Sequence, residues 1–83
     1  MTSQDGPRRR YNANQSRQDI LESAEREFAE KGYYGARVQA IADRAQINKR
    51  MIYEYYSSKD QLYQAVLSDF YRRLSAEEQH LID

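Results

Sequence analysis

Two short amphipathic segments separated by a tight turn constrain the fold of this chain most strongly. Apolar side chains recur at the i, i+3, i+4 and i+7 positions of a helix over about residues 37–45, namely at Val38, Ile41, Ala42 and Ala45. A turn at Gln46 follows, and Asn48 is then a favourable N-cap for a second helix that reaches about Tyr56. Two short helices joined by such a turn form a helix-turn-helix unit, predicted here over residues 37–56.

A longer helix is predicted before this unit, over about residues 17–31. Its apolar positions lie at helical spacing at Ile20, Leu21, Ala24 and Phe28. Ser16 and Asp19 resemble a capping box at its start, and Gly32 is expected to end it. The opposite face is predicted to be solvated, and it carries Asp19, Glu22, Arg26 and Glu30. Tyr33 and Tyr34 are expected to close the corner that leads to the next helix.

A fourth helix is predicted after Ser58, which forms a capping-box pattern with Gln61. It carries a broad apolar stripe at Leu62, Tyr63, Val66, Leu67, Phe70 and Leu74. The predicted fold class is therefore all-α: a three-helix, homeodomain-like helix-turn-helix core within residues 17–74, plus the start of a linking fourth helix that ends over residues 75–83.

Composition argues against several classes of function. The 83 residues suit one small domain, and the lack of cysteine excludes disulfides and thiolate catalysis. There is one histidine, and neither a carboxylate pair nor a glycine-rich phosphate loop stands out, so we expect no enzyme, no catalytic residue and no cofactor. His80 is interpreted as a surface residue rather than a metal ligand. Without a long apolar run or a signal-peptide pattern, a soluble, cytoplasmic protein without a membrane partner is expected.

The net charge of zero conceals two basic segments. Residues 1–17 carry four arginines and one aspartate, and residues 37–59 carry five basic and two acidic side chains. Because salt screens charges beyond about 8–10 Å, a polyanion responds to such a local surface rather than to the total charge. Residues 1–16 are predicted to be a flexible basic arm, in which Arg8, Arg9 and Arg10 could enter a DNA minor groove or merely improve solubility.

The second helix of the unit is predicted to have one buried and one exposed side. At 100° per residue, Ile52, Tyr55 and Tyr56 share one arc, whereas Lys49, Arg50, Tyr53 and Glu54 share the other. We therefore expect Tyr56 to be buried, Tyr55 to lie at the border and Tyr53 to be exposed. Two cations and a phenol at a helix start suit phosphate, and the B-DNA major groove admits one such helix.

The sequence from Ile20 to Leu67 closely resembles the DNA-binding domain of TetR-type transcriptional regulators. The resemblance rests on Phe-Ala-Glu-Lys-Gly-Tyr at residues 28–33, on Ile41-Ala42, on Tyr53 with the Tyr55-Tyr56 pair, and on Ser58-Lys59-Asp60. It implies a homodimeric regulator, usually a repressor, that binds a double-stranded and usually palindromic operator. It also implies a C-terminal effector domain that binds a small molecule, and we expect that domain to be absent from this chain.

The resemblance also implies roles for individual residues. Lys49, Arg50 and Met51 occupy positions that read bases in the family. The positions that contact the DNA backbone in the family are held by Arg37, Gln39, Tyr53, Tyr55 and Lys59.

Three positions depart from the family pattern. Arg37 replaces a Ser or Thr that would cap its helix, Gln46 replaces a turn glycine, and Arg50 replaces a small residue. A positive φ at Gln46 would cost about 1–2 kcal/mol. Arg50 would bring a bidentate donor suited to guanine O6 and N7.

Two hypotheses for function come from these patterns. The first is sequence-specific binding of double-stranded DNA by a ligand-responsive repressor, with the second helix of the unit in the major groove. The alternative is a helix-turn-helix module that binds proteins and not DNA. The salt dependence of duplex binding separates the two hypotheses. Each phosphate that a DNA-binding chain neutralises steepens the log–log slope of affinity against salt, whereas a protein-interaction module predicts almost no slope.

Overall fold

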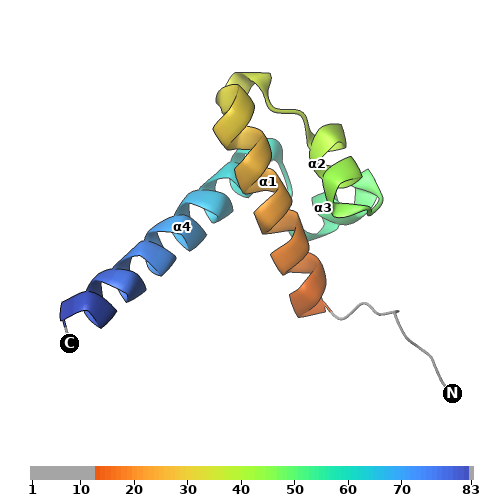
Figure 1. Ribbon diagram of the computed structural model, residues 1–83. Helices are drawn as coiled ribbons and strands as arrows, with labels where there is room; N and C mark the ends of the chain where they lie inside the picture. The colour runs from red at the N-terminus through yellow and green to blue at the C-terminus, as the bar shows by residue number, and fades with distance from the viewer. Residues whose placement is uncertain (1–12, 83) are drawn as a thin grey trace, which may run out of the picture.

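The structure is a computed structural model that describes the backbone of residues 13–82 and the side chains of residues 13–76. The described residues form four α-helices and no strand (Figure 1): α1 (Ala13–Gly35), α2 (Val38–Ala45), α3 (Lys49–Tyr55) and α4 (Lys59–Ile82). The predicted all-α, four-helix class is confirmed. The predicted basic arm, with Arg8, Arg9 and Arg10, lies almost entirely outside the described residues.

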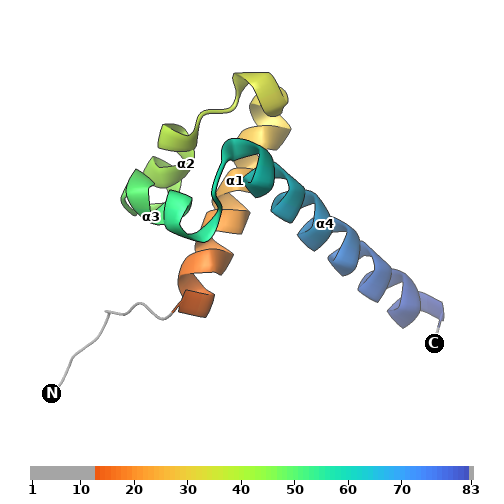
Figure 2. The same ribbon diagram turned by 180° about the vertical axis from the view of Figure 1, so that it is seen from behind.

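At the centre of the core, each helix contributes one large, fully buried aliphatic side chain, namely Ile20, Ile41, Ile52 and Leu62. Helix α1 packs against both α2 and α4, and α2 packs against α3. The C-terminal part of α4 projects away from the other three helices, as both views show (Figures 1 and 2). For this reason the predicted apolar stripe of α4 is only partly correct: Leu62 and Val66 are buried, but Phe70 and Leu74 are about two-fifths exposed, at 41% and 42%.

Helix α1 differs from the prediction at both ends. It begins at Ala13, so Ser16 lies inside the helix and is buried, with 2% exposure, instead of acting as an N-cap. At the other end, Gly32 adopts φ 73° and ψ 174° and kinks the helix, and a further turn then continues to Gly35. The Ala36 N–H donates to the Gly32 carbonyl at 3.0 Å, which closes this extra turn. A glycine tolerates positive φ, so it allows the helix to bend where an ordinary residue would be strained.

The turn between α2 and α3 agrees closely with its prediction. Gln46 adopts the left-handed conformation, with φ 60° and ψ 44°, and the Ile47 N–H donates to the Ala42 carbonyl at 3.0 Å. The Asn48 side chain caps α3 by accepting the Arg50 N–H at 2.7 Å. These local hydrogen bonds fix the direction in which α3 leaves the turn.

The start of α4 is also capped as predicted. The Ser58 Oγ accepts the Gln61 N–H at 3.1 Å, and the Gln61 Oε1 accepts the N–H of Ser57 at 3.3 Å. The return bond thus goes to Ser57, one residue before the position that a standard capping box uses. The result is a fixed corner that places Lys59 at the first position of α4.

Candidate nucleic-acid interface

Helix α3 presents its basic residues to solvent. Lys49 and Arg50 are exposed, Tyr53 is 41% exposed and Met51 is half-buried, whereas Ile52 is buried at 1%. The Asn48 cap fixes the first turn, so the two cations leave the helix at its N-terminal end. The division of α3 into a buried and an outward side, predicted from helical spacing, is confirmed for these residues.

The three tyrosines of this segment lie at different depths. Tyr53 is exposed and Tyr55 is half-buried, as predicted. Tyr56 was expected to be buried, but it is half-buried, because it follows the last turn of α3 as its C-cap in extended conformation, with φ −132°. Leaving the helix takes its side chain off the buried arc that helical spacing had assigned to it.

The other predicted contact residues lie at the starts of α2 and α4. Arg37 is exposed at the N-cap of α2, and its side chain makes no capping hydrogen bond. Gln39, in the first turn, donates from its Nε2 to the Asp43 carboxylate at 3.1 Å. Lys59 is half-buried, with its Nζ 4.8 Å from the centroid of the Tyr33 ring. A cation held over an aromatic face keeps its N–H donors available for a further acceptor.

Tyr33 supports Lys59 from within an aromatic cluster. Its ring lies 6.1 Å from that of Phe28 in a stacked arrangement and 5.0 Å from that of Tyr63 in an edge-on arrangement. Tyr33 therefore closes the corner after α1, as predicted. The same prediction was wrong for Tyr34, which is 93% exposed, because the turn that follows the Gly32 kink points it outward.

Arg17 is a basic residue near α3 that the sequence interpretation missed. Its guanidinium carbon lies 5.5 Å from the centroid of the Tyr55 ring, and its Nη2 donates to the Asn14 side chain at 2.8 Å. The position of Arg17 in a basic segment was a signal. Its contact with α3 depends on how α1 crosses the other helices, which spacing along one helix does not reveal.

The described cations fall into two groups according to their partners. One group forms ion pairs with carboxylates and consists of Lys31, Arg44, Arg72 and Arg73. The other group forms no ion pair with any carboxylate among side chains 13–76 and consists of Arg17, Arg26, Arg37, Lys49, Arg50 and Lys59. Apart from Arg26, every member of the second group lies on α3, near the start of α1, at the N-cap of α2 or at the first position of α4. The five unpaired cations other than Arg26, together with the exposed residues of α3, form the candidate interface.

Comparison with known proteins identifies the family. The profile of bacterial regulatory proteins of the tetR family matches residues 20–66, which is more than half of the chain. The chain belongs to the tetR family. The match spans the helix-turn-helix unit and most of the interface, including Arg37, Arg50 and Lys59.

Named transcriptional regulators and a solved structure are also similar to this chain. The transcriptional repressor NicS of Pseudomonas putida is 36% identical over 73 residues, which cover 88% of this chain and 34% of NicS. The transcriptional activator FasR of Mycolicibacterium smegmatis is 41% identical over 54 residues, covering 65% of this chain and 25% of FasR. A TetR-like regulator from Rhodococcus sp. RHA1 superposes with a TM-score of 0.83 at 31% identity, over 89% of this chain and 40% of that one. The chain thus spans between a quarter and two-fifths of these relatives.

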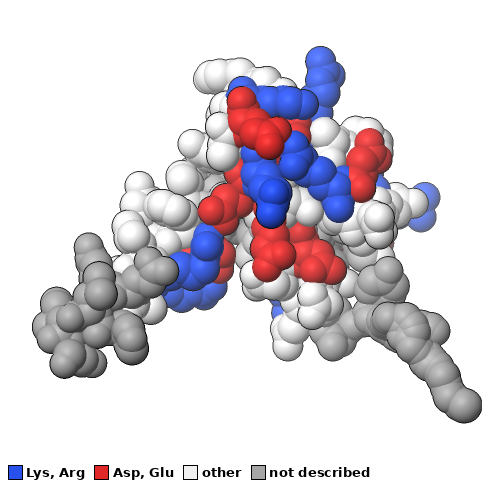
Figure 3. All heavy atoms as spheres, viewed as in Figure 1, with Lys and Arg blue, Asp and Glu red and all other residues white. Residues whose placement is uncertain are grey.

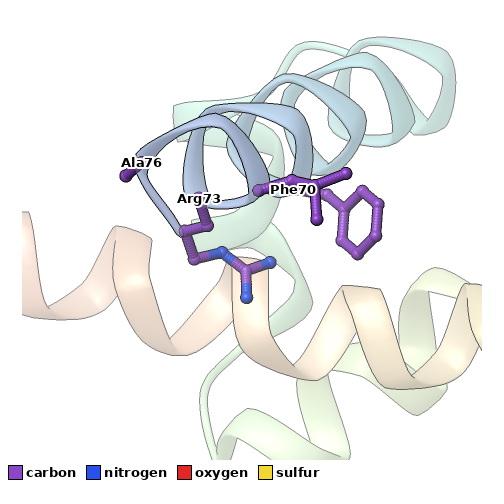
Figure 4. Close-up of a pocket in the computed structure, with 4 residues that line it drawn as sticks. Phe70, Arg73 and Ala76 are labelled. Carbon is purple, nitrogen blue, oxygen red and sulfur yellow. The ribbon is translucent and has the colours of Figure 1, made fainter. Parts of the chain in front are cut away.

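The candidate interface of this tetR-family chain shares no residue with a pocket on α4. A shallow pocket on α4 is lined by Phe70, Arg73, Leu74 and Ala76 (Figure 4). Arg73 points from there toward α1, where it pairs with Glu25. Within residues 13–82, no helix is long and apolar enough to cross a membrane. Among the side chains of residues 13–76, no group of three His, Asp or Glu could hold a metal ion, and the side chain of His80 lies outside the described residues.

Proposed function

We propose that this chain binds double-stranded DNA in a sequence-specific manner, as the DNA-binding part of a transcriptional regulator. The observation that carries the proposal is the distribution of ion pairs. Cations away from α3 are mostly satisfied by carboxylates, whereas those on α3 and at the adjoining helix starts have none among the described residues. Cations that lack an internal counter-charge are available to phosphates, which supply most of the affinity of proteins for DNA.

In this proposal α3 lies in the major groove. Lys49, Arg50 and Met51, in its first turn, read base edges, as the N-terminal residues of recognition helices do. The exposed guanidinium of Arg50 suits the two acceptors of a guanine, O6 and N7. The DNA backbone is held by Tyr53 and Tyr55 of α3 and by Arg37, Gln39 and Lys59 at the starts of α2 and α4. Arg17 joins them through its position over the Tyr55 ring.

The whole protein is proposed to be a homodimer that binds a palindromic operator and represses transcription in response to a small molecule. Support comes from the family and from NicS, which is named a repressor, although FasR is named an activator. Effector binding and dimerisation would belong to a C-terminal domain, because the relatives extend well beyond the region matched here. Two half-sites would lie about 34 Å apart or a multiple of that distance. The chain alone, holding one half-site, should bind weakly.

Duplex binding as a function of salt tests the proposal. Duplexes enriched by the chain from a random pool would be labelled, and binding would be followed by fluorescence anisotropy at several salt concentrations. Each neutralised phosphate contributes about −0.9 to the log–log slope, so contacts by Arg17, Arg37 and Lys59 predict a slope of about −3. A salt slope near zero would instead support a protein-interaction module.

A matched pair of substitutions tests whether the salt dependence of duplex binding arises from the candidate interface. Lys59→Gln should reduce the magnitude of the slope by about one, because one phosphate contact is lost. Arg26→Gln removes the same charge from an exposed position in the middle of α1 and should leave the slope unchanged. Equal changes for both variants would show that the overall charge, and not the interface, determines binding.

A further inference from the structure

Helix α2 begins without a side-chain cap of its own. Its N-cap is Arg37, in extended conformation at φ −124° and ψ 134°, and this side chain accepts no hydrogen bond from the first turn. In a capping box, the third residue of the helix reaches back to the N–H of the N-cap residue. Here that third residue is Ala40, which carries no acceptor. The N–H of Arg37 therefore needs a partner from another part of the chain.

That partner is Glu27 of α1, which is fully buried, with 0% exposure. Its Oε2 accepts the Arg37 N–H at 3.3 Å and lies 3.4 Å from the Lys31 Nζ, and its Oε1 lies 3.3 Å from the Arg44 Nε. On the surface above this buried carboxylate, acidic and basic side chains are interleaved over α1 and α2 (Figure 3). Both oxygens of this buried carboxylate are thus used, one of them by the backbone of the residue that starts α2.

The surroundings keep this carboxylate ionised at neutral pH. Burial raises the pKa of Glu27, but the Arg37 N–H and the charges of Lys31 and Arg44 outweigh burial, so that the pKa lies below its usual value. A hydrogen bond from a backbone N–H to a charged carboxylate is stronger than one to a neutral acceptor. An ionised Glu27 therefore attaches the start of α2 firmly to α1.

We propose that Glu27 is a positioning residue for the DNA backbone contact of Arg37. Glu27 supplies, from α1, the half of the capping box that α2 lacks, and so fixes the backbone of Arg37. The side chain of Arg37 is then not needed as a cap. It is exposed and forms no ion pair with the carboxylates of residues 13–76, so it can be directed at a phosphate. This inference rests on the proposed function, since it assigns Arg37 a phosphate.

Amide hydrogen exchange tests the positioning without DNA. Glu27→Leu removes the acceptor, so exchange of the Arg37 N–H should become about five- to tenfold faster than in the parent chain, as expected for one lost hydrogen bond. Glu27→Gln keeps an acceptor oxygen and should restore most of the protection. Glu30→Gln, which loses only the exposed partner of Arg44, is the matched control and should leave this amide unchanged. Unchanged exchange at Arg37 in Glu27→Leu would overturn the proposal.

Duplex binding tests the consequence for Arg37. Glu27→Leu should reduce the magnitude of the log–log salt slope by about one, as Arg37→Gln does, and the double variant should lose no more than either alone. A merely stabilising Glu27 would change the free energy of unfolding and leave this slope intact, which would overturn the positioning role. If Glu27→Leu does not fold, Glu27→Gln serves instead: because it keeps an acceptor oxygen, protection of the Arg37 amide and the salt slope should both be retained, or be lost together, and a change in one without the other would contradict the positioning role.

The two measurements also separate this inference from the proposed function. If the parent chain binds no duplex but Glu27→Leu exposes the Arg37 amide, the capping of Arg37 by Glu27 is upheld and the proposed DNA binding is refuted. If the parent chain has a steep salt slope that Glu27→Leu leaves unaltered, DNA binding is upheld and the positioning role of Glu27 is refuted.

Discussion

Arg44 and Arg50 are six residues apart in the same helix-turn-helix unit, yet their surroundings differ completely. Arg44, on α2, lies between two carboxylates, with its Nε 3.3 Å from Glu27 and its Nη2 2.6 Å from Glu30. Arg50, on α3, forms no ion pair with any carboxylate among the described side chains. The same guanidinium therefore serves the fold in one place and is available to a ligand in the other.

The difference arises from where acidic side chains are buried. Glu27 is fully buried between α1 and α2, and a buried carboxylate needs cations and N–H donors around it. The outward side of α3 carries an exposed carboxylate, Glu54, but among the described side chains it forms no ion pair with Lys49 or Arg50, so these cations remain solvated. The net charge of zero hides this division, because the acidic residues are concentrated on α1 and α4.

The largest expected effect is on stability, and it tests the contrast between Arg44 and Arg50 directly. Arg44→Ala should lower the free energy of unfolding by about 2–3 kcal/mol, since it removes a partner of a buried carboxylate, and Lys31 compensates only in part. Arg50→Ala, at an exposed and unpaired position, should change it by less than about 0.5 kcal/mol. Urea unfolding followed by circular dichroism measures both. Similar losses in the two variants would mean that Arg50 also supports the fold.

Arg50→Ala should instead affect recognition. At one base-pair position of the selected duplexes, discrimination should fall by about 2 kcal/mol, because a bidentate contact to a base edge is lost. Binding to single-base variants of the enriched sequence, compared by anisotropy, would locate this position. Arg26→Ala is the matched control, since it deletes an exposed arginine outside the interface. A uniform loss over all duplexes would contradict a base-reading role and would place Arg50 on a phosphate.

Tyr53→Phe should have a smaller effect that does not depend on sequence. Removing the hydroxyl deletes one hydrogen bond to a phosphate, so binding to every duplex should weaken by about 1 kcal/mol. Tyr34→Phe removes a hydroxyl from a ring that is 93% exposed and outside the interface, and it should change nothing. A change in base preference for Tyr53→Phe would mean that its hydroxyl contacts a base instead.

Features that depend on local chemistry were predictable from the sequence. The positive φ of Gln46 was suggested only by the turn glycine that the family resemblance places there. The Asn48 cap and the Ser58–Gln61 pair, in contrast, each involve residues within a few positions of one another. Their geometry follows from short-range hydrogen bonding and sterics, which a sequence displays directly. The outward side of α3 was predictable for the same reason, since helical spacing alone separates Ile52 from Lys49 and Arg50.

Features that depend on helix crossing were not predicted. Glu27 lies seven residues after Ile20 and three after Ala24, so it occupies the buried stripe of α1, and a charge at that position was a signal that was passed over. Its partners Arg37 and Arg44 become visible only when α1 and α2 pack. The partial exposure of Phe70 likewise depends on how far α4 extends beyond α1.

The smallest expected effect concerns the turn that joins the two contrasted helices. Gln46 adopts φ 60°, a left-handed conformation that costs a non-glycine residue about 1–2 kcal/mol. Gln46→Gly relieves this strain but gives the unfolded chain more freedom, so the net gain should be at most about 1 kcal/mol. Urea unfolding measures this gain, with Gln39→Gly inside α2 as the control that should destabilise. Because the Asn48 cap and the Ile47 N–H bond to Ala42 are untouched, α3 should keep its direction and the salt slope should stay the same. A changed slope in Gln46→Gly would show that the side chain of Gln46, and not only its backbone, helps to place the cations of α3.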